Sequence, residues 1–335
     1  MAEMRYVELG GSGLTVSRLC LGGMSFGVPT PPRPWTVGYD ETRAVIAAAL
    51  DAGINFIDTA NCYADGTSEE YIGRALHELG VPRENVVLAS KVFYNDGGLS
   101  REAIMREIDG TLARLGTDYL DLYVIHRFDA ATPIEETLAA LDELVRAGRV
   151  RAIGASAMYA YQLHNMQSVA AASGLTPFST MQSQYNLLYR EDEHEMIPVC
   201  RQFGMALTPY SSLAAGRLTR PSWDASTRRS KTDVISQKKF DPMRSWDEKI
   251  VSRVAELAER HSVPMAAIAI AWLWARGVES PIVGCSRPDL VGAACRALDV
   301  ELTDEERTYL EEPYVAHPLV GVRPHDLAEL VARKV

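Results

Sequence analysis

One structural unit recurs along most of the chain, and this recurrence restricts the fold more than any other feature of the sequence. Short apolar runs typical of β-strands alternate with stretches whose apolar residues recur at helical spacing. The runs end near Gly23, Asp58, Lys91, His126, Ser156, Gln182, Tyr210 and Gly284. Up to Tyr210, consecutive ends are 26 to 35 residues apart, the length of one strand with its crossover helix. Eight such units predict an α/β fold, a (β/α)8 TIM barrel formed as a single domain over residues 1–335.

Two of the intervening stretches have recognisable helix boundaries. The first is expected to begin after Ser100, whose side chain can cap a helix, and to end at Gly116. The second is expected to have Thr132 as its cap, Pro133 in its first turn and Gly148 as its terminator. Both fit crossover helices of a barrel.

Two segments depart from the repeat. Residues 6–17, YVELGGSGLTVS, contain two short extended runs about a glycine-rich turn, which predicts a hairpin that covers the bottom of the barrel. Residues 211–246, after the seventh strand, are polar and predict a long loop before the next helix. Long loops of this kind often cover ligands.

Composition and charge exclude several classes of partner. The formal net charge of -10 argues against a general affinity for nucleic acid or anionic membranes. The longest apolar run, residues 265–275, is about half the roughly twenty residues that a membrane span needs, so a buried helix is expected there. The N-terminus lacks the pattern of a secretory signal. We therefore expect a cytoplasmic protein with a small-molecule ligand.

The five cysteines form no CxxC pair and have no histidine at zinc spacing, which predicts reduced thiols and no metal site. Cys62 directly precedes Tyr63, and the sequence leaves open whether it is a reactive thiol at the rim of a site or a packed bystander. The motifs GxGxxG, GxxxxGK[ST], GxSxG and HExxH are absent, so neither a Rossmann crevice, a P-loop nor the common hydrolase sites are supported.

Four residues at or just after strand ends predict acid chemistry. Asp58, Tyr63, Lys91 and His126 follow successive apolar runs, and parallel strands present their carboxyl ends on one face. An ammonium near a phenol lowers the pKa of the phenol, and a carboxylate keeps the ammonium charged. Each residue alone is more often structural, but the set of four favours a site in which Tyr63 donates a proton.

With these residues assembled, the chain resembles the aldo-keto reductase superfamily, in its bacterial NADPH-dependent form, over nearly its whole length. The motifs that carry the resemblance are NFIDTANCYADGTSEEYIGRAL, KVF and YVIHRFD. The resemblance implies a reductase that transfers hydride to an aldehyde or ketone without a metal. In such a reductase Tyr63 is the proton donor, Lys91 and Asp58 tune it, and His126 orients the carbonyl.

The resemblance also implies NADPH/NADP+ as the cofactor, bound across the top of the barrel. Ser156 and Gln182 are expected to hold the carboxamide, and Tyr210 to stack on the nicotinamide. The remaining expected contacts are Gly23, Met24, Asp58, Ser211, Leu213, Gly216, Gly284, Ser286 and Arg287, with Arg220 and Arg228 as secondary candidates. Ser286 and Arg287 are the expected partners of the 2′-phosphate, because Pro288 can open a helix there.

Two positions depart from the family pattern. Many relatives have Asn after the serine that matches Ser156, where this chain has Ala157. Relatives often place a Glu-Asn pair against the adenine, where this chain has Ala293 and Ala294. These departures predict weaker contacts to the carboxamide and the adenine.

The substrate is not determined by the sequence. Four aromatic residues after strand ends could line an apolar pocket or simply pack under loops: Trp35, Phe93, Tyr94 and Phe128. The expected partner is a small carbonyl compound, and a homo-oligomer is compatible with the sequence. Three alternatives stay open: a Schiff-base aldolase, an NADPH-binding redox sensor with slow turnover, and a specialised reductase of a keto-sugar or biosynthetic intermediate.

Overall fold

The computed structural model describes residues 3–224 and 226–320. Within them, eight parallel strands pair in the order β10-β3-β4-β5-β6-β7-β8-β9. The strands are β3 (Cys20–Gly22), β4 (Phe56–Asp58), β5 (Val87–Val92), β6 (Leu120–Ile125), β7 (Val150–Ser156), β8 (Thr180–Gln182), β9 (Ala206–Leu207) and β10 (Ile282–Gly284). The amide of Ile282 donates to the carbonyl of Pro209 at 2.9 Å, which joins the two ends of the sheet. The predicted (β/α)8 barrel is confirmed.

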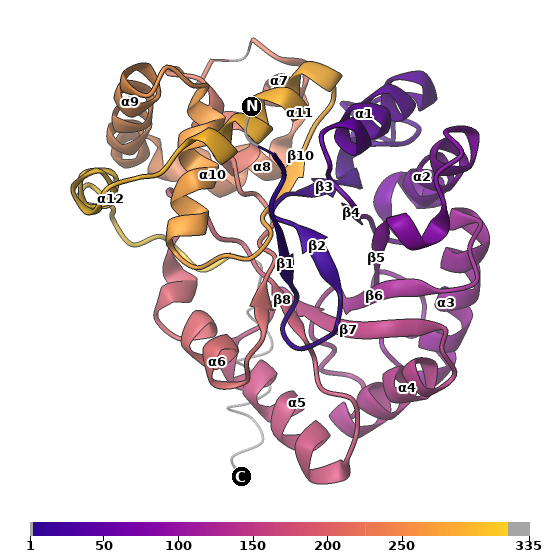
Figure 1. The fold of residues 1–335 in the computed structure, drawn as a ribbon. Coiled ribbons are helices and arrows are strands. Elements are labelled where there is room, and N and C mark those ends of the chain that lie inside the picture. Colours follow the sequence, from indigo (N-terminus) through magenta and orange to yellow (C-terminus); the bar gives the residue numbers. More distant parts are fainter. Residues whose placement is uncertain (1–2, 225, 321–335) are drawn as a thin grey trace.

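Helices surround the barrel, as Figure 1 shows from the end at which the hairpin lies. They are α1 (Tyr39–Asp51), α2 (Thr67–Glu78), α3 (Arg101–Leu115), α4 (Ile134–Arg146), α5 (Ala160–Ser173), α6 (Met196–Gln202), α7 (Arg228–Thr232), α8 (Val234–Phe240), α9 (Arg244–Arg260), α10 (Met265–Ala275), α11 (Pro288–Cys295) and α12 (Asp304–Glu311). The apolar run at 265–275 is α10, which is buried over most of its length. No helix among the described residues is long and apolar enough to cross a membrane.

The N-terminal hairpin closes one end of the barrel, as predicted. Its strands β1 (Tyr6–Glu8) and β2 (Thr15–Ser17) pair antiparallel. Leu9, Leu14 and Val16 are buried in one apolar cluster with residues from the barrel strands, such as Phe56 and Leu122. A second, larger cluster fills the layer between strands and helices. The hairpin thus plugs the bottom of the barrel and leaves the opposite end for function.

The predicted helix boundaries hold except at the start of α4, where both predicted positions are shifted by one residue. Ser100 caps α3 by accepting a hydrogen bond from the amide of Ala103, and Gly116 ends the helix with a φ of 65°. Thr132 is not the cap of α4. Pro133 occupies that position, because its carbonyl accepts the first helical hydrogen bonds, while the Thr132 hydroxyl donates to Asp129 at 2.8 Å.

The segment predicted as a long loop after the seventh strand is an insertion with its own secondary structure. It contains a 3-10 turn at Ala214–Thr219 and the short helices α7 and α8. Asp233 caps α8 through its side chain, and Phe240 is buried. We call residues 211–243 the insertion. Polar composition concealed these helices, because they are shorter than the stretches from which helical periodicity can be read.

The contact between hairpin and barrel can be tested at Gly10. A Cβ atom there would lie 2.0 Å from the carbonyl oxygen of Ser179, and the φ of Gly10 is +49°. Gly13 has a φ of +72°, but a Cβ atom there meets nothing within 4 Å. We expect Gly10→Ala to lower the free energy of unfolding by more than about 3 kcal/mol and Gly13→Ala by only about 1 kcal/mol, measured by urea denaturation. Equal losses in the two variants would contradict this account of the plug.

Candidate active site

A buried ion pair lies at the centre of the open end of the barrel. Asp58 ends β4, Lys91 lies near the end of β5, and the Lys91 Nζ is 2.5 Å from Asp58 Oδ1. The same ammonium donates to the carbonyl of Thr59 at 2.6 Å, and the Gln182 amide donates to Asp58 Oδ2 at 2.9 Å. Lys91 is completely buried. Burial lowers the pKa of Lys91, but Asp58 and Tyr63 outweigh it and raise that pKa above its ordinary value, so the lysine is cationic.

A strained turn positions Tyr63 beside this pair. Tyr63 begins a 3-10 turn that runs to Gly66, and both Ala64 and Asp65 adopt positive φ values of 47° and 54°. This conformation costs about 1 kcal/mol or more per non-glycine residue. The turn brings the Tyr63 hydroxyl to 3.4 Å from Lys91 Nζ and the ring centroid to 4.9 Å from the same atom.

The pKa of Tyr63 differs from the expectation. Lys91 lowers it, as the sequence suggested, but burial is the larger effect and the pKa is raised from its ordinary value. The sequence could not show this, because the degree of burial depends on the loops that close over the barrel. The phenol is therefore fully protonated at neutral pH and stands as a donor next to a cation.

His126 directly follows β6 and faces Tyr63. The two rings meet edge to face with centroids 5.8 Å apart, and Tyr94 packs on the imidazole at 5.0 Å. Burial, followed by the charges of Lys91, Arg127 and Arg33, lowers the pKa of His126 well below its usual range. The imidazole is consequently neutral at neutral pH.

Cys62 lies at the rim of this site. Its Sγ is 3.8 Å from Nδ1 of His126. Burial raises the pKa of the thiol, with Arg33 and Lys91 opposing. A protonated thiol is a weak nucleophile, so the geometry favours a packing role over a reactive one.

The strand ends bring further predicted residues together. Ser156 is paired with Gln182 in the sheet, and its hydroxyl donates to the Gln182 carbonyl at 2.6 Å. Gly284 is paired with Gly22, which is paired in turn with Asp58. Gly23 and Met24 follow in the 3-10 turn Gly23–Ser25. All of these residues therefore lie at the open end of the barrel, close to the ion pair.

The predicted pyrophosphate segment folds into a left-handed turn. Ser211, Ala214, Ala215 and Gly216 have φ values of 56°, 49°, 53° and 92°. Tyr210, just before them, is half-buried, and the ammonium of Lys239 lies 5.0 Å from its ring centroid. In the described part of the chain, six of the seven non-glycine residues with positive φ lie at the open end of the barrel: Ala64, Asp65, Ala157, Ser211, Ala214 and Ala215.

The predicted phosphate partners are more dispersed. Arg287 lies at the N-terminus of α11, as the sequence predicted, and its exposed guanidinium pairs with Asp289 at 3.0 Å. Ser286 is half-buried next to it, and Ala293 and Ala294 lie further along the same helix. The insertion contains a cavity. Arg228 is exposed at the start of α7 and does not line this cavity.

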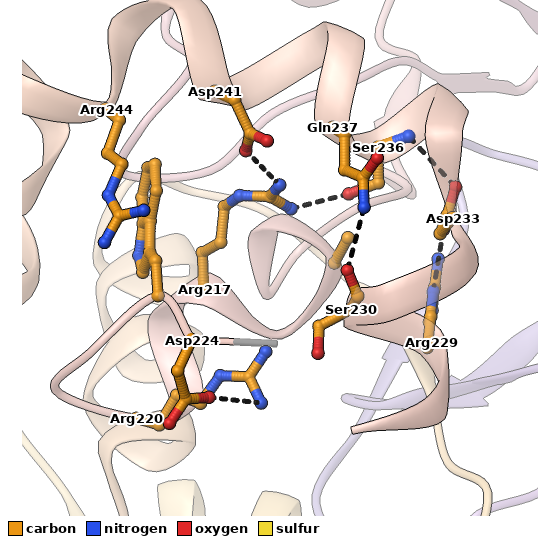
Figure 2. Close-up of a pocket in the computed structure, with 12 residues that line it drawn as sticks. Arg217, Arg220, Asp224, Arg229, Ser230, Asp233, Ser236, Gln237, Asp241 and Arg244 are labelled. Atoms are coloured by element: carbon orange, nitrogen blue, oxygen red, sulfur yellow. Dashed lines mark hydrogen bonds and ion pairs between the residues drawn. The ribbon is translucent and has the colours of Figure 1, made fainter. Parts of the chain in front are cut away.

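Arg220 does line that cavity, which has a volume of about 210 Å³ (Figure 2). Arg217 lies in its centre and donates to Ser236 at 2.5 Å and to Asp241 at 2.6 Å. Three buried nitrogen atoms in the lining have no partner among the described residues: Nε of Arg217, Nε of Arg220 and Nε1 of Trp223. The cavity adjoins the left-handed turn through Ala215.

The expected aromatic pocket is only partly assembled. Tyr94 contacts His126 and is about half exposed, whereas Trp35 is buried beneath the guanidinium of Arg229, 4.2 Å from its ring. Phe93 packs against Tyr94 with centroids 5.1 Å apart. Phe128 is half-buried against the apolar core.

The sequence did not single out Arg33 and Lys239, which lie over Tyr63 and Tyr210 respectively. Arg33 lies in the loop after β3 and Lys239 on the short helix α8, and no sequence pattern in either segment fixes the direction of a side chain. No group of three or more His, Cys, Asp or Glu side chains in residues 3–224 and 226–320 is arranged to hold a metal ion.

Comparison with known proteins agrees with this architecture. Residues 18–314 match the aldo/keto reductase family. An aldo-keto reductase of Fusarium vanettenii is 40% identical over 94% of this chain and 92% of the relative. Versiconal hemiacetal acetate reductase of Aspergillus parasiticus is 40% identical over 93% of this chain and 97% of the relative. A putative aryl-alcohol dehydrogenase of Schizosaccharomyces pombe is 40% identical over 94% and 97%. The chain therefore belongs to the aldo/keto reductase family and is an oxidoreductase.

Proposed function

We propose that the protein reduces an aldehyde or ketone to an alcohol with NADPH, and that Tyr63 protonates the carbonyl oxygen. The observation that carries this proposal is the protonated Tyr63 phenol 3.4 Å from the Lys91 ammonium, which Asp58 holds in place. An acid of this kind supports transfer of a hydride to carbon by neutralising the charge that develops on oxygen.

The chain's own residues divide the proton chemistry. Tyr63 gives its proton to the substrate oxygen, and Lys91 stabilises the phenolate that remains. Asp58 keeps the ammonium charged and oriented. Neutral His126 can donate a hydrogen bond to the same oxygen. We assign that hydrogen to Nε2, because the protonated Cys62 thiol faces Nδ1.

The residues at the open end fit a nicotinamide dinucleotide. When bound, this cofactor supplies the hydride. Ser156 and Gln182 would hold the carboxamide, and the half-buried Tyr210 ring would stack on the nicotinamide. The left-handed turn at Ser211–Gly216 supports a pyrophosphate contact, since backbone N–H groups in such turns form concave anion sites. Leu213 belongs to the same turn, and the unpaired Nε of Arg220 supports a secondary role in binding phosphate.

The other readings are weaker. A Schiff-base aldolase needs a neutral amine, whereas Lys91 is buried, cationic and bound to Asp58. A redox sensor would retain the cofactor with negligible turnover, and a panel of carbonyl compounds assayed by loss of NADPH absorbance distinguishes it. The three relatives named above are fungal, so the bacterial type stays a prediction. Reduction of a keto-sugar or biosynthetic intermediate remains a narrower form of the same proposal.

Removal of the Tyr63 hydroxyl tests the proton donor. Tyr63→Phe should keep the fold and NADPH binding but lower kcat by about a hundredfold to ten-thousandfold, because general acid catalysis is lost. Tyr71→Phe on α2, remote from the site against Tyr39, is the control and should retain full activity. Turnover of Tyr63→Phe close to that of wild type would refute the assignment.

We infer that the preference for NADPH over NADH depends on Arg287. Arg287→Ala should weaken NADPH binding at least tenfold and leave NADH almost unchanged, because charge-assisted hydrogen bonds to the 2′-phosphate are lost. Dissociation constants from fluorescence quenching measure this effect. Arg296→Ala, at the opposite end of α11, should change neither constant. If Arg287→Ala weakened the binding of both cofactors equally, the 2′-phosphate would have to be bound by other residues.

The lowered pKa of His126 predicts a pH-dependent loss of stability. Below an ordinary histidine pKa of about 6.5 the unfolded chain binds a proton that the folded protein excludes, so stability falls as pH falls. The slope from this one group is at most about 1.4 kcal/mol per pH unit. When urea unfolding is measured at pH 7.5 and at pH 5.5, the free energy of unfolding should fall less between the two for His126→Asn than for wild type. The same substitution at exposed His77 is the control. Identical losses in wild type and His126→Asn would show that the imidazole is protonated in the folded protein.

A further inference from the structure

Cationic side chains surround the catalytic residues on the open side of the barrel. Arg33, in the loop after β3, places its Cζ 5.3 Å from the ring centroid of Tyr63 and donates to the Cys62 carbonyl at 3.4 Å. Lys239, on α8, places its ammonium over Tyr210. Arg127 follows His126 directly and donates through Nε to the hydroxyl of Tyr94. Three different segments therefore contribute positive charge to one rim.

The two segments that carry Arg33 and Lys239 are in contact with each other. Trp35, two residues after Arg33, is 6% exposed, and the guanidinium of Arg229 from the insertion lies on its ring. Arg229 is in turn paired with Asp233, the residue that caps α8. This chain of contacts fixes the loop and the helix against one another, so the two cations are held by packing and are not on independent flexible loops.

Arg33 and Lys239 are not paired with a carboxylate in residues 3–224 and 226–320. Among the described residues, none of the ion pairs within 4.0 Å involves Arg33 or Lys239, and the nearby Asp233 is engaged by Arg229 at 2.9 Å. Burial, followed by the charge of Arg127, lowers the pKa of Lys239 to about 8, with the charge of Asp233 opposing. The charges that act on the pKa of His126 are all cationic and come from Lys91, Arg127 and Arg33. A desolvated cation that is not paired with a carboxylate is unfavourable, and a bound anion would stabilise it.

We propose that Arg33 and Lys239 select carbonyl substrates that carry a carboxylate. The proposal rests on the proposed function, because it places the carbonyl at Tyr63 and uses Arg33, on the same ring, to recognise the anionic part of the same molecule. A guanidinium can bind a carboxylate through two parallel hydrogen bonds, and the Lys239 ammonium adds a point charge. The preferred substrates are therefore oxo acids and aldehydes with a carboxylate, in preference to neutral carbonyl compounds.

A matched pair of substrates tests this inference. Para-carboxybenzaldehyde and its methyl ester share the ring and the aldehyde and differ in charge. We would measure kcat/KM for both with wild type, Arg33→Gln and Lys239→Met, and the NADPH dissociation constant for each protein. Lys238→Met is the control, because Lys238 is the exposed neighbour of Lys239 on the same helix.

Wild type should prefer the acid over the ester by at least tenfold. Each variant should reduce this preference by about tenfold, change kcat/KM for the ester less than threefold and leave NADPH binding unaltered. Lys238→Met should behave as wild type. An equal rate for acid and ester, or variants that weaken NADPH and both substrates alike, would overturn the proposal. The second outcome would show that Arg33 and Lys239 bind the phosphates of the cofactor. Absence of turnover with every carbonyl compound would instead refute the proposed reductase itself.

Discussion

The ion pair between Asp58 and Lys91 is the interaction on which the rest of the site depends. Lys91 is completely buried, so its charge is stable only because the carboxylate and the Thr59 carbonyl accept its hydrogens. Removing one partner of such a pair usually costs about 3–5 kcal/mol, because the other charge is left uncompensated. The pair joins the ends of β4 and β5, and Gln182 extends the network to β8. The barrel thus holds a cation next to Tyr63, as the proposed proton transfer requires, and Tyr63 lies at the point where the network meets the open end.

Backbone strain is concentrated at the same end. The chain turns left-handed directly after Tyr63, after Ser156 and after Tyr210, through Ala64, Ala157 and Ser211. Asparagine tolerates this conformation better than alanine. The asparagine expected in relatives after the serine therefore suits the backbone there as well as a ligand, and Ala157 accepts the same φ of 47° at a cost of about 1 kcal/mol. Strain of this kind persists only where the surrounding structure fixes it, and it is typical of functional sites.

The sequence was sufficient for what depends on local pattern. The spacing of strand ends predicted the barrel, and the strand-end positions of Asp58 and Lys91 placed them together because parallel strands share one direction. The burial of side chains, and their direction in loops, could not be predicted from the sequence. The pKa of Tyr63 is raised and not lowered, because the extent of its desolvation depends on the covering segments. Arg33 and Lys239 carried no signal, since their position over the site results from the packing of Arg229 on Trp35. The roles of the individual site residues remain predictions.

The most direct test of the proposed reaction is to follow the hydride itself. NADPH carrying deuterium on one face of nicotinamide C4 would be supplied with an aldehyde, and the alcohol analysed by mass spectrometry and NMR. The proposed stacking of the nicotinamide on Tyr210 would leave one face toward Tyr63, so we expect deuterium on the carbinol carbon from one labelled face and none from the other. Transfer from both faces, or an alcohol whose new hydrogen comes from solvent, would contradict direct and one-sided hydride transfer in this barrel.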